Sequence, residues 1–325
     1  MSTSNQILTK IPLAQRRKGA KRYRVTNGLS LRLCAFAREI FSLSRAFVVL
    51  AKPEITLMVM ISAGVASLMA SDSLRIIVLV HSVVGIGLLA AGASILNQYL
   101  ERKLDGKMRR TARRPLPAGE LTAHQALVFG VAVSVSGMLY VLLVLNALTA
   151  LLGLLTLICY LFVYTPLKTK TRLSTFIGAF PGAAPVLMGW SATTNTLSLE
   201  ALTLYAILFL WQFPHFYAIG WLYREDYARA GMLMLPADQS GDRTTFRLIL
   251  ISTQLLIIAS LLFTLFAYNG IFYLVSAVIV GICFYHFAYQ LSLARSKLAA
   301  KRLLHASVIY LPLLYLFMLI DKIDL

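Results

Sequence analysis

Nine apolar segments, each long enough to cross a lipid bilayer, dominate this chain of 325 residues. A hydrocarbon core about 30 Å thick needs about 20 apolar residues in helical conformation. Helices satisfy every backbone hydrogen bond within their own segment, which a lipid environment demands. We therefore predict an all-α, polytopic membrane protein built as a bundle of nine transmembrane helices. The nine segments are 53–71, 75–98, 121–145, 147–165, 174–193, 200–222, 247–267, 270–292 and 304–320.

The basic residues of the chain are confined to one side of these segments. Charged residues make up only 14% of the chain, which excludes an ordinary water-soluble domain, and the net charge is +18. Of the 31 Lys and Arg residues, all except Arg75 and Lys322 lie in the N-terminal tail or in the gaps after the second, fourth, sixth and eighth segments. The positive-inside rule places these parts in the cytoplasm. We expect no nucleic-acid partner, because the basic residues form no soluble face.

The first 50 residues are predicted to form a basic cytoplasmic tail, followed by a membrane domain over residues 51–325. Residues 1–38 contain nine Lys and Arg and no acid. A mitochondrial transit peptide is the alternative, but the first membrane segment follows so closely that we favour the bacterial inner membrane over the mitochondrial one. Within the tail, residues 29–49 alternate apolar and basic types, which is typical of an interfacial helix.

Two long gaps contain acidic as well as basic residues, and they follow the second and sixth segments. Polar groups that accumulate beside membrane helices mark functional sites. Their equal spacing predicts two pseudo-repeated four-helix units, each with a polar loop at the same place, plus a ninth helix.

Three oxygen-bearing side chains recur every four residues at the end of the second segment: Asn97, Glu101 and Asp105. On a helix such residues share a face, with Cβ atoms about 5–6 Å apart. Two carboxylates this close at a membrane boundary repel each other unless a cation lies between them. Oxygen ligands suit Mg²⁺, whose coordination shell a substrate phosphate often completes. The pattern indicates a magnesium site; the alternative is a solvated helix end whose acids pair with nearby basic residues.

An arginine-rich stretch follows these acids. Arg110 and Arg114 are four residues apart, and guanidinium groups bind phosphate oxygens in a bidentate manner. Carboxylates followed by such arginines indicate a diphosphate site. Lys168 and Lys170, in the gap after the fourth segment, either mark topology or reach the same phosphates.

The end of the sixth segment carries a second acidic group. Glu225 and Asp226 are expected to occupy the place in the second unit that the first acids hold in unit one. A second set of Mg²⁺ ligands at this place would face the first set and hold a diphosphate between the two. The alternative is a surface Asp226 paired with Arg229.

His215 lies inside the same apolar segment, next to Trp211 and other aromatic residues. Such a histidine is either a hydrogen-bond partner between helices or a ligand. The aromatic side chains around it either wall an apolar ligand and stabilise a cation, or only pack.

Six stretches between residues 47 and 320 resemble one family. The chain resembles the heme O synthase (protoheme IX farnesyltransferase) branch of the UbiA-type intramembrane prenyltransferase superfamily. The Asn/acid motif marks the superfamily, whereas the stretches around His215 and Asp226 mark the heme branch. The matching stretches are Leu50–Pro53, Asn97–Pro117, Tyr164–Lys168, Ile177–Trp190, Trp211–Phe216 and Asp226–Pro236.

The resemblance implies a nine-helix bundle around a lipid-accessible cavity. It also implies Mg²⁺-dependent transfer of farnesyl from farnesyl diphosphate to a vinyl group of heme b, giving heme O for heme-copper oxidases. A heme A synthase or an oxidase assembly factor is a further implied partner. The implied roles are metal binding and catalysis by Asn97, Glu101, Asp105 and Asp226, diphosphate binding by Arg110, Arg114, Lys168 and Lys170, and heme binding by His215, Trp211 and Tyr164, with His215 also catalytic.

Two positions depart from the superfamily pattern. Glu101 stands where Asp is usual, and Ala230 stands where the second motif has a further acid, which leaves the ligands of a second metal open.

Three other functions are alternatives to heme farnesylation. The alternative of the same class is a prenyltransferase for a quinone precursor. A transporter for an anion would instead need acids or broken helices near the bilayer midplane, and a structural assembly factor would not need the Asn/Glu/Asp face.

Overall fold

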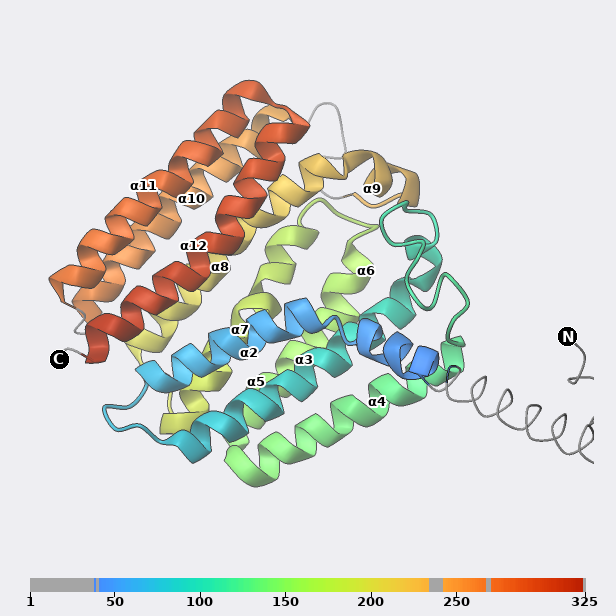
Figure 1. Cartoon of the computed structure of the whole chain (residues 1–325), viewed down its shortest axis with the longest axis horizontal. Coiled ribbons are helices and arrows are strands. Elements are labelled where there is room, and N and C mark those ends of the chain that lie inside the picture. Colours follow the sequence, from blue (N-terminus) through green and yellow to red (C-terminus); the bar gives the residue numbers. More distant parts are fainter. Residues whose placement is uncertain (1–37, 39–40, 234–241, 267–269, 324–325) are drawn as a thin grey trace, which may run out of the picture. The chain divides into compact units, whose positions relative to one another are not determined.

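The computed structural model describes residue 38 and residues 41–233, 242–266 and 270–323, and these are helical with connecting turns (Figure 1). The chain divides into two compact units, Met1–Val48 and Val49–Leu325. Most of the predicted N-terminal tail lies outside the described residues. Of the interfacial helix predicted over residues 29–49, residues 41–48 are described in the first unit, and they are helical.

Each of the nine predicted segments corresponds to a helix of the second unit. The third and fourth predicted segments each end in a π-helical stretch, which the apolar pattern did not predict. In chain order the elements are α2 (Pro53–Met69), α3 (Ile76–Asp105), α4 (Ala123–Tyr140), η1 (Val141–Leu145), α5 (Ala147–Ile158), η2 (Cys159–Tyr164), α6 (Thr165–Leu167), α7 (Ser174–Thr194), α8 (Leu199–Leu222), α9 (Arg224–Ala230), α10 (Asp242–Phe266), α11 (Ile271–Ala294) and α12 (Lys297–Ile323).

Most of these helices are long and apolar enough to span a bilayer. Within the described residues seven helices meet both conditions, and an eighth is counted if Phe41–Leu50 and α2 form one broken span. The helix α7, with 21 residues and two internal prolines, lies outside that set. The chain is therefore a polytopic membrane protein, and the observed helices are compatible with the predicted bundle of nine.

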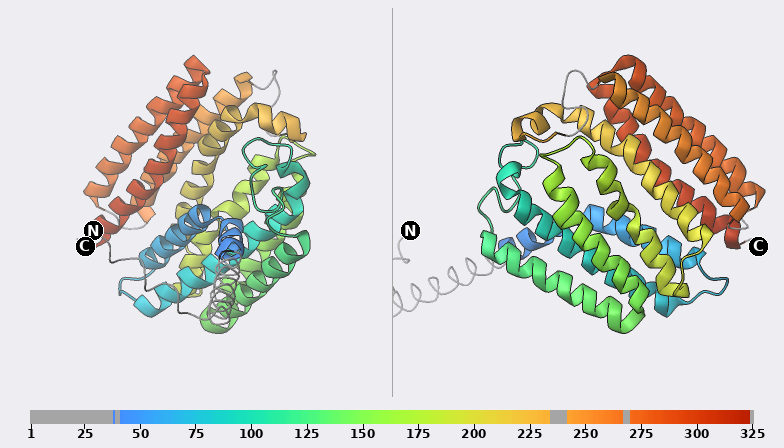
Figure 2. Two further views of the ribbon diagram at one scale, coloured as in Figure 1. Left: turned by 45° about the vertical axis from the view of Figure 1, so that its right-hand side comes forward. Right: turned by 180° about the vertical axis from the view of Figure 1, so that it is seen from behind.

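Neighbouring helices pack in antiparallel pairs and carry the polar loops to one end. The pairs α3–α4, α8–α10 and α11–α12 are in extensive contact, and α2 packs on both α3 and α7. Figures 1 and 2 show the loop after α3 beside α9 at this end. In the loop after α3, Met108 packs against Tyr227 of α9. Just after α9, the backbone N–H of Leu233 donates to the backbone oxygen of Lys168 at 2.8 Å.

The helix α7 crosses α2 in direct backbone contact at Gly189. A Cβ atom on Gly189 would collide with the backbone oxygen of Ala63, which cannot rotate away. Replacing Gly189 with Ala should therefore force α2 and α7 apart, at a cost of about 1–3 kcal/mol. The midpoint of heat denaturation in detergent micelles should fall accordingly. Gly106→Ala is the control, because its new Cβ would lie 3.8 Å from the nearest atoms; equal midpoints for both variants would contradict the prediction.

Candidate active site

The polar end of α3 carries the three predicted oxygen ligands on one continuous helix. The helix runs to Asp105, beyond the predicted end at residue 98, and Gly106 follows it. Asn97, Glu101 and Asp105 thereby share a face, and their exposed fractions are only 1%, 5% and 1%. Two carboxylates as buried as these must be compensated by nearby cations.

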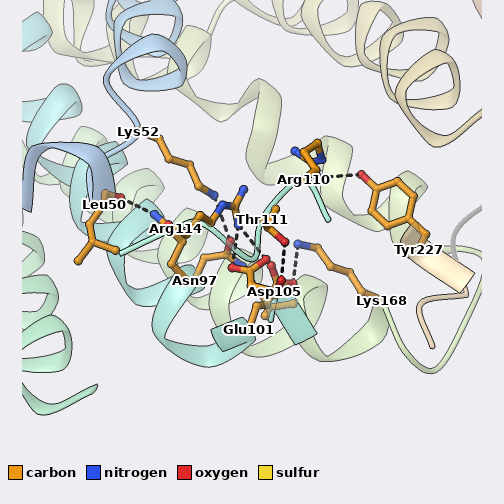
Figure 3. Close-up of polar contacts among 12 residues, drawn as sticks. Leu50, Lys52, Asn97, Glu101, Asp105, Arg110, Thr111, Arg114, Lys168 and Tyr227 are labelled. Atoms are coloured by element: carbon orange, nitrogen blue, oxygen red, sulfur yellow. Dashed lines mark hydrogen bonds and ion pairs between the residues drawn. The ribbon is translucent and has the colours of Figure 1, made fainter. Parts of the chain in front are cut away.

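Two cations from other segments face the carboxylates of α3 (Figure 3). A guanidinium nitrogen of Arg114 lies 2.9 and 2.8 Å from the two oxygens of Asp105. The ammonium of Lys168 lies 2.7 Å from Oε1 of Glu101. This ion pair is buried, because the side chains of Lys168 and Glu101 are only 11% and 7% exposed. Burial acts to lower the pKa of Lys168, but Tyr164 and Glu101 outweigh burial and raise it above its ordinary value.

The amide of Asn97 is oriented by a hydrogen bond to the π-helical stretch. The hydroxyl of Thr165 donates to the backbone oxygen of Tyr160 at 2.8 Å and accepts from Nδ2 of Asn97 at 3.0 Å. This arrangement assigns the amide: its Oδ1 points away from Thr165, toward the ammonium of Lys52 at 3.4 Å. A third cation thus faces the third oxygen of the α3 face.

The two polar loops meet, as their equivalent positions in the sequence suggested. The backbone N–H of Arg110 donates to a carboxylate oxygen of Asp226 at 3.2 Å, and Arg229 donates to its other oxygen at 3.0 Å. The guanidinium of Arg110 donates to the hydroxyl of Tyr227 at 3.4 Å and lies over the ring of Tyr223. The pairing with Arg229 that was the alternative does occur, but Asp226 is buried while Arg229 is exposed.

Two predicted residues lie outside this cluster. Glu225 was expected to share the place of Asp226, and that expectation is wrong. Adjacent helical residues point in different directions, so Glu225 is exposed and pairs with Lys297 at 2.9 Å. This hydrogen bond lowers the pKa of Glu225. Lys170 is also exposed, and the contacts of the cluster do not include it.

His215 belongs to a second cluster, between α8 and α12. Its Nδ1 lies 2.8 Å from the hydroxyl oxygen of Ser307, and its ring stacks on Trp211 with centroids 4.6 Å apart. The indole N–H of Trp211 donates to the backbone oxygen of Ser307 at 2.8 Å. Tyr164, predicted to bind heme with them, instead contacts Lys168 through its ring, at 4.6 Å.

Three residues of these clusters were not identified as functional from the sequence: Lys52, Thr165 and Ser307. Lys52 and Thr165 lie in stretches that carried the family resemblance, but their contacts with Asn97 span 45 and 68 residues of chain. A lysine at the start of a membrane helix ordinarily indicates topology. The sequence around Ser307 did not indicate a function, because the hydroxyl of a serine in an apolar helix commonly donates to a backbone oxygen of the same helix.

The α3 face fits a magnesium ion bound together with a diphosphate. No group of three His, Cys, Asp or Glu residues gathers in the described parts of the chain, so a metal held by protein side chains alone is not indicated there. Mg²⁺, however, takes one or two carboxylates and relies on substrate phosphates for further ligands. Glu101 and Asp105 are two such carboxylates, and the amide oxygen of Asn97 is a third oxygen donor on the same helix. Three cations facing two carboxylates leave positive charge for an anion.

Solved structures share this fold. A structure titled as digeranylgeranylglyceryl phosphate synthase matches with a TM-score of 0.72 and 17% identity, over 87% of this chain and 99% of that one. A UbiA homolog from Archaeoglobus fulgidus, bound to GPP and Mg²⁺, matches with a TM-score of 0.60 and 12% identity, over 84% of this chain and 99% of that one.

Sequence relatives are closer. A protoheme IX farnesyltransferase of Solibacter usitatus is 44% identical over 86% of this chain and 99% of that relative. A protoheme IX farnesyltransferase of Koribacter versatilis is 39% identical over 87% of this chain and 95% of that relative. The model of the UbiA prenyltransferase family matches residues 57–310. The chain therefore belongs to the UbiA prenyltransferase family, and it is a prenyltransferase.

Proposed function

We propose that this chain transfers the farnesyl group of farnesyl diphosphate to a vinyl group of heme b, with addition of water, giving heme O. The observation that carries the proposal is the near full-length similarity to proteins called protoheme IX farnesyltransferase, at 44% and 39% identity. The buried cluster supports the diphosphate half of the reaction, and the His215 cluster supports the heme half.

The α3 face and its cations would receive the diphosphate. Asn97, Glu101 and Asp105 would hold Mg²⁺, with Asp226 contributing from the second polar loop. The bound Mg²⁺ would withdraw charge from the diphosphate and so stabilise it as a leaving group. Its arrival would free the cations that face these side chains in the ligand-free structure.

The freed cations would then bind the phosphate oxygens directly. Arg114 and Lys168 lie against the carboxylates, so a small rotation of each side chain redirects it to an anion. Arg110, with its guanidinium over Tyr223, would contribute from the loop. We leave Lys170 out of the proposed set because it is exposed. Preorganised charges in a site that excludes water stabilise developing negative charge strongly.

The reaction balances with water as the third reactant. The bond between C1 of farnesyl and the diphosphate oxygen breaks, and C1 forms a bond to the terminal vinyl carbon. Water adds to the resulting cation on the adjacent carbon, and its loss of a proton leaves the hydroxyl of heme O. Aromatic side chains such as Trp211 would shield the cation from other nucleophiles.

His215 lies deeper in the membrane than the diphosphate cluster. Seven residues separate it from the end of α8 at Leu222, which is about 10 Å along the helix axis. A substrate with a polar head and a long apolar chain fits such an arrangement, with its diphosphate at the membrane boundary. We propose that His215 contacts heme, either as an axial ligand or as the acceptor of the released proton.

The cellular setting follows from the same proposal. Residues 51–325 would form the prenyltransferase domain in a bacterial inner membrane, with residues 1–50 as a cytoplasmic tail. Delivery of the product to a heme A synthase or to an oxidase under assembly would follow, because a farnesylated heme remains in the bilayer.

The reaction can be tested in membranes that lack endogenous heme O. With heme b, farnesyl diphosphate and Mg²⁺ supplied, we expect extraction and mass spectrometry to detect a heme heavier by one farnesyl group plus one water. EDTA should abolish its formation, because the α3 carboxylates require a metal to bind the diphosphate. If folded protein yields no new heme beside an active control enzyme, the quinone-type prenyltransferase becomes the better interpretation, to be assayed with aromatic acceptors.

A further inference from the structure

A single residue of α12 holds both aromatic rings of the His215 cluster. The hydroxyl of Ser307 contacts Nδ1 of His215, and its backbone oxygen accepts from the indole of Trp211, each at 2.8 Å. Ser307 is fully buried. The imidazole is therefore fixed by a hydrogen bond at one nitrogen and by stacking on one ring face.

The direction of the Ser307 hydroxyl decides which nitrogen of His215 carries the proton. A serine hydroxyl has one hydrogen to donate and lone pairs to accept. Ser307 donates to the backbone oxygen of Leu304 at 2.7 Å. Its oxygen can then only accept from Nδ1. The neutral imidazole accordingly carries its proton on Nδ1, which leaves a lone pair on Nε2.

We propose that Ser307 is a positioning residue that holds His215 in the Nδ1–H tautomer and so presents an unprotonated Nε2 to the heme substrate. The inference rests on the proposed function and deepens it. The hydrogen bond of His215 to Ser307 is made by Nδ1 and not by Nε2, and His215 is half-buried. An axial ligand of heme iron and a proton acceptor both need this free lone pair.

The tautomer can be read directly by ¹⁵N nuclear magnetic resonance. The full chain, labelled at histidine and reconstituted in lipid bilayers without heme, should show a protonated Nδ1 and an unprotonated Nε2 for the signal that His215→Gln removes. Ser307→Ala should shift this signal toward the Nε2–H form, which an imidazole without a directing partner prefers. An Nε2–H tautomer in the parent, or no shift in Ser307→Ala, would overturn the inference.

Binding of heme b provides a second, independent measurement. Loss of a hydrogen bond that orients a metal-binding histidine costs about 10–100-fold in affinity, and we expect Ser307→Ala to weaken heme b binding by about 10-fold or more. Ser252→Ala is the matched control, because its buried hydroxyl donates only to backbone oxygens of its own helix. The double variant Ser307→Ala/His215→Gln should bind no more weakly than His215→Gln, since both changes act through one ring.

The variants also separate this inference from the proposal on which it rests. If His215→Gln binds and farnesylates heme b as the parent does, the role proposed for His215 fails. If His215→Gln is impaired while Ser307→Ala binds heme b like Ser252→Ala, only the role of Ser307 fails.

Discussion

Replacing Glu101 with Gln, or Asp105 with Asn, should lower the rate of heme O formation by about 100-fold or more. Groups that merely orient metal ligands already contribute about 10–100-fold, and each substitution here removes a carboxylate that we propose to bind the metal directly. The measurement is the initial rate as a function of Mg²⁺ concentration. We expect half-maximal activity to require more Mg²⁺, because a neutral amide is a weaker ligand than a carboxylate.

The same substitutions disturb the ligand-free protein, so stability must be measured beside activity. Asp105 pairs with Arg114, and Glu101 with Lys168. Removal of one partner from a buried pair leaves a cation without compensation. A loss of activity through unfolding would lower the denaturation midpoint and would not respond to added Mg²⁺, whereas a loss of metal affinity would be partly reversed by it.

Glu225→Gln is the matched control for this prediction. It makes the same carboxylate-to-amide change beside the second polar loop, but Glu225 is exposed and its partner is Lys297. Its activity and Mg²⁺ dependence should equal those of the parent. Parent-like turnover in Glu101→Gln and Asp105→Asn would rule out the assignment of a metal to the α3 face.

The parts of the fold that the sequence predicted are those governed by local patterns. Apolar runs of membrane length predicted the membrane helices, of which seven or eight in the described residues have the length and composition of a span, because burial in lipid depends on composition over a single segment. The four-residue spacing of Asn97, Glu101 and Asp105 gave their common face, because the helical period acts over a few residues. The structure continues α3 as one helix to Asp105, past the predicted end of the apolar segment at residue 98, so the three side chains do share a face.

The parts that were missed depend on contacts between distant segments. The separation of Asp226, which is buried, from Glu225, which is exposed, depends on how α9 lies against the loop after α3. The π-helical stretch before Thr165 has no sequence signature of its own, yet it brings the hydroxyl of Thr165 to Asn97. The sequence also did not predict which basic residues pair with Glu101 and Asp105, because several lysines and arginines outside the membrane segments were candidates.

Lys52→Gly should lower heme O formation by about 100-fold without lowering thermal stability. Lys52 adopts a left-handed backbone conformation, with φ of 48°, which costs a residue with a side chain about 1–3 kcal/mol and which glycine adopts freely. The fold therefore retains a strained lysine where glycine would be more stable. This conformation directs its side-chain nitrogen to Oδ1 of Asn97, where burial, and after it the nearby Arg114 and Lys168, lower the pKa of Lys52 to about 7.

Arg114 and Lys168 each pair with a carboxylate of α3, whereas Lys52 faces the uncharged amide oxygen of Asn97, which is why we assign Lys52 to the diphosphate. Loss of one preorganised group that stabilises developing negative charge costs about 10²–10³-fold in rate. Kinetics with varied farnesyl diphosphate should show a raised KM as well as a lowered kcat, and Lys52→Arg should recover part of both. Lys103→Met, which removes an exposed cation from the same end of α3, should behave as the parent. If Lys52→Gly retained parent turnover, the ammonium would have no role beyond its contact with Asn97; if activity and denaturation midpoint fell together, its role would be to hold α2 against α3.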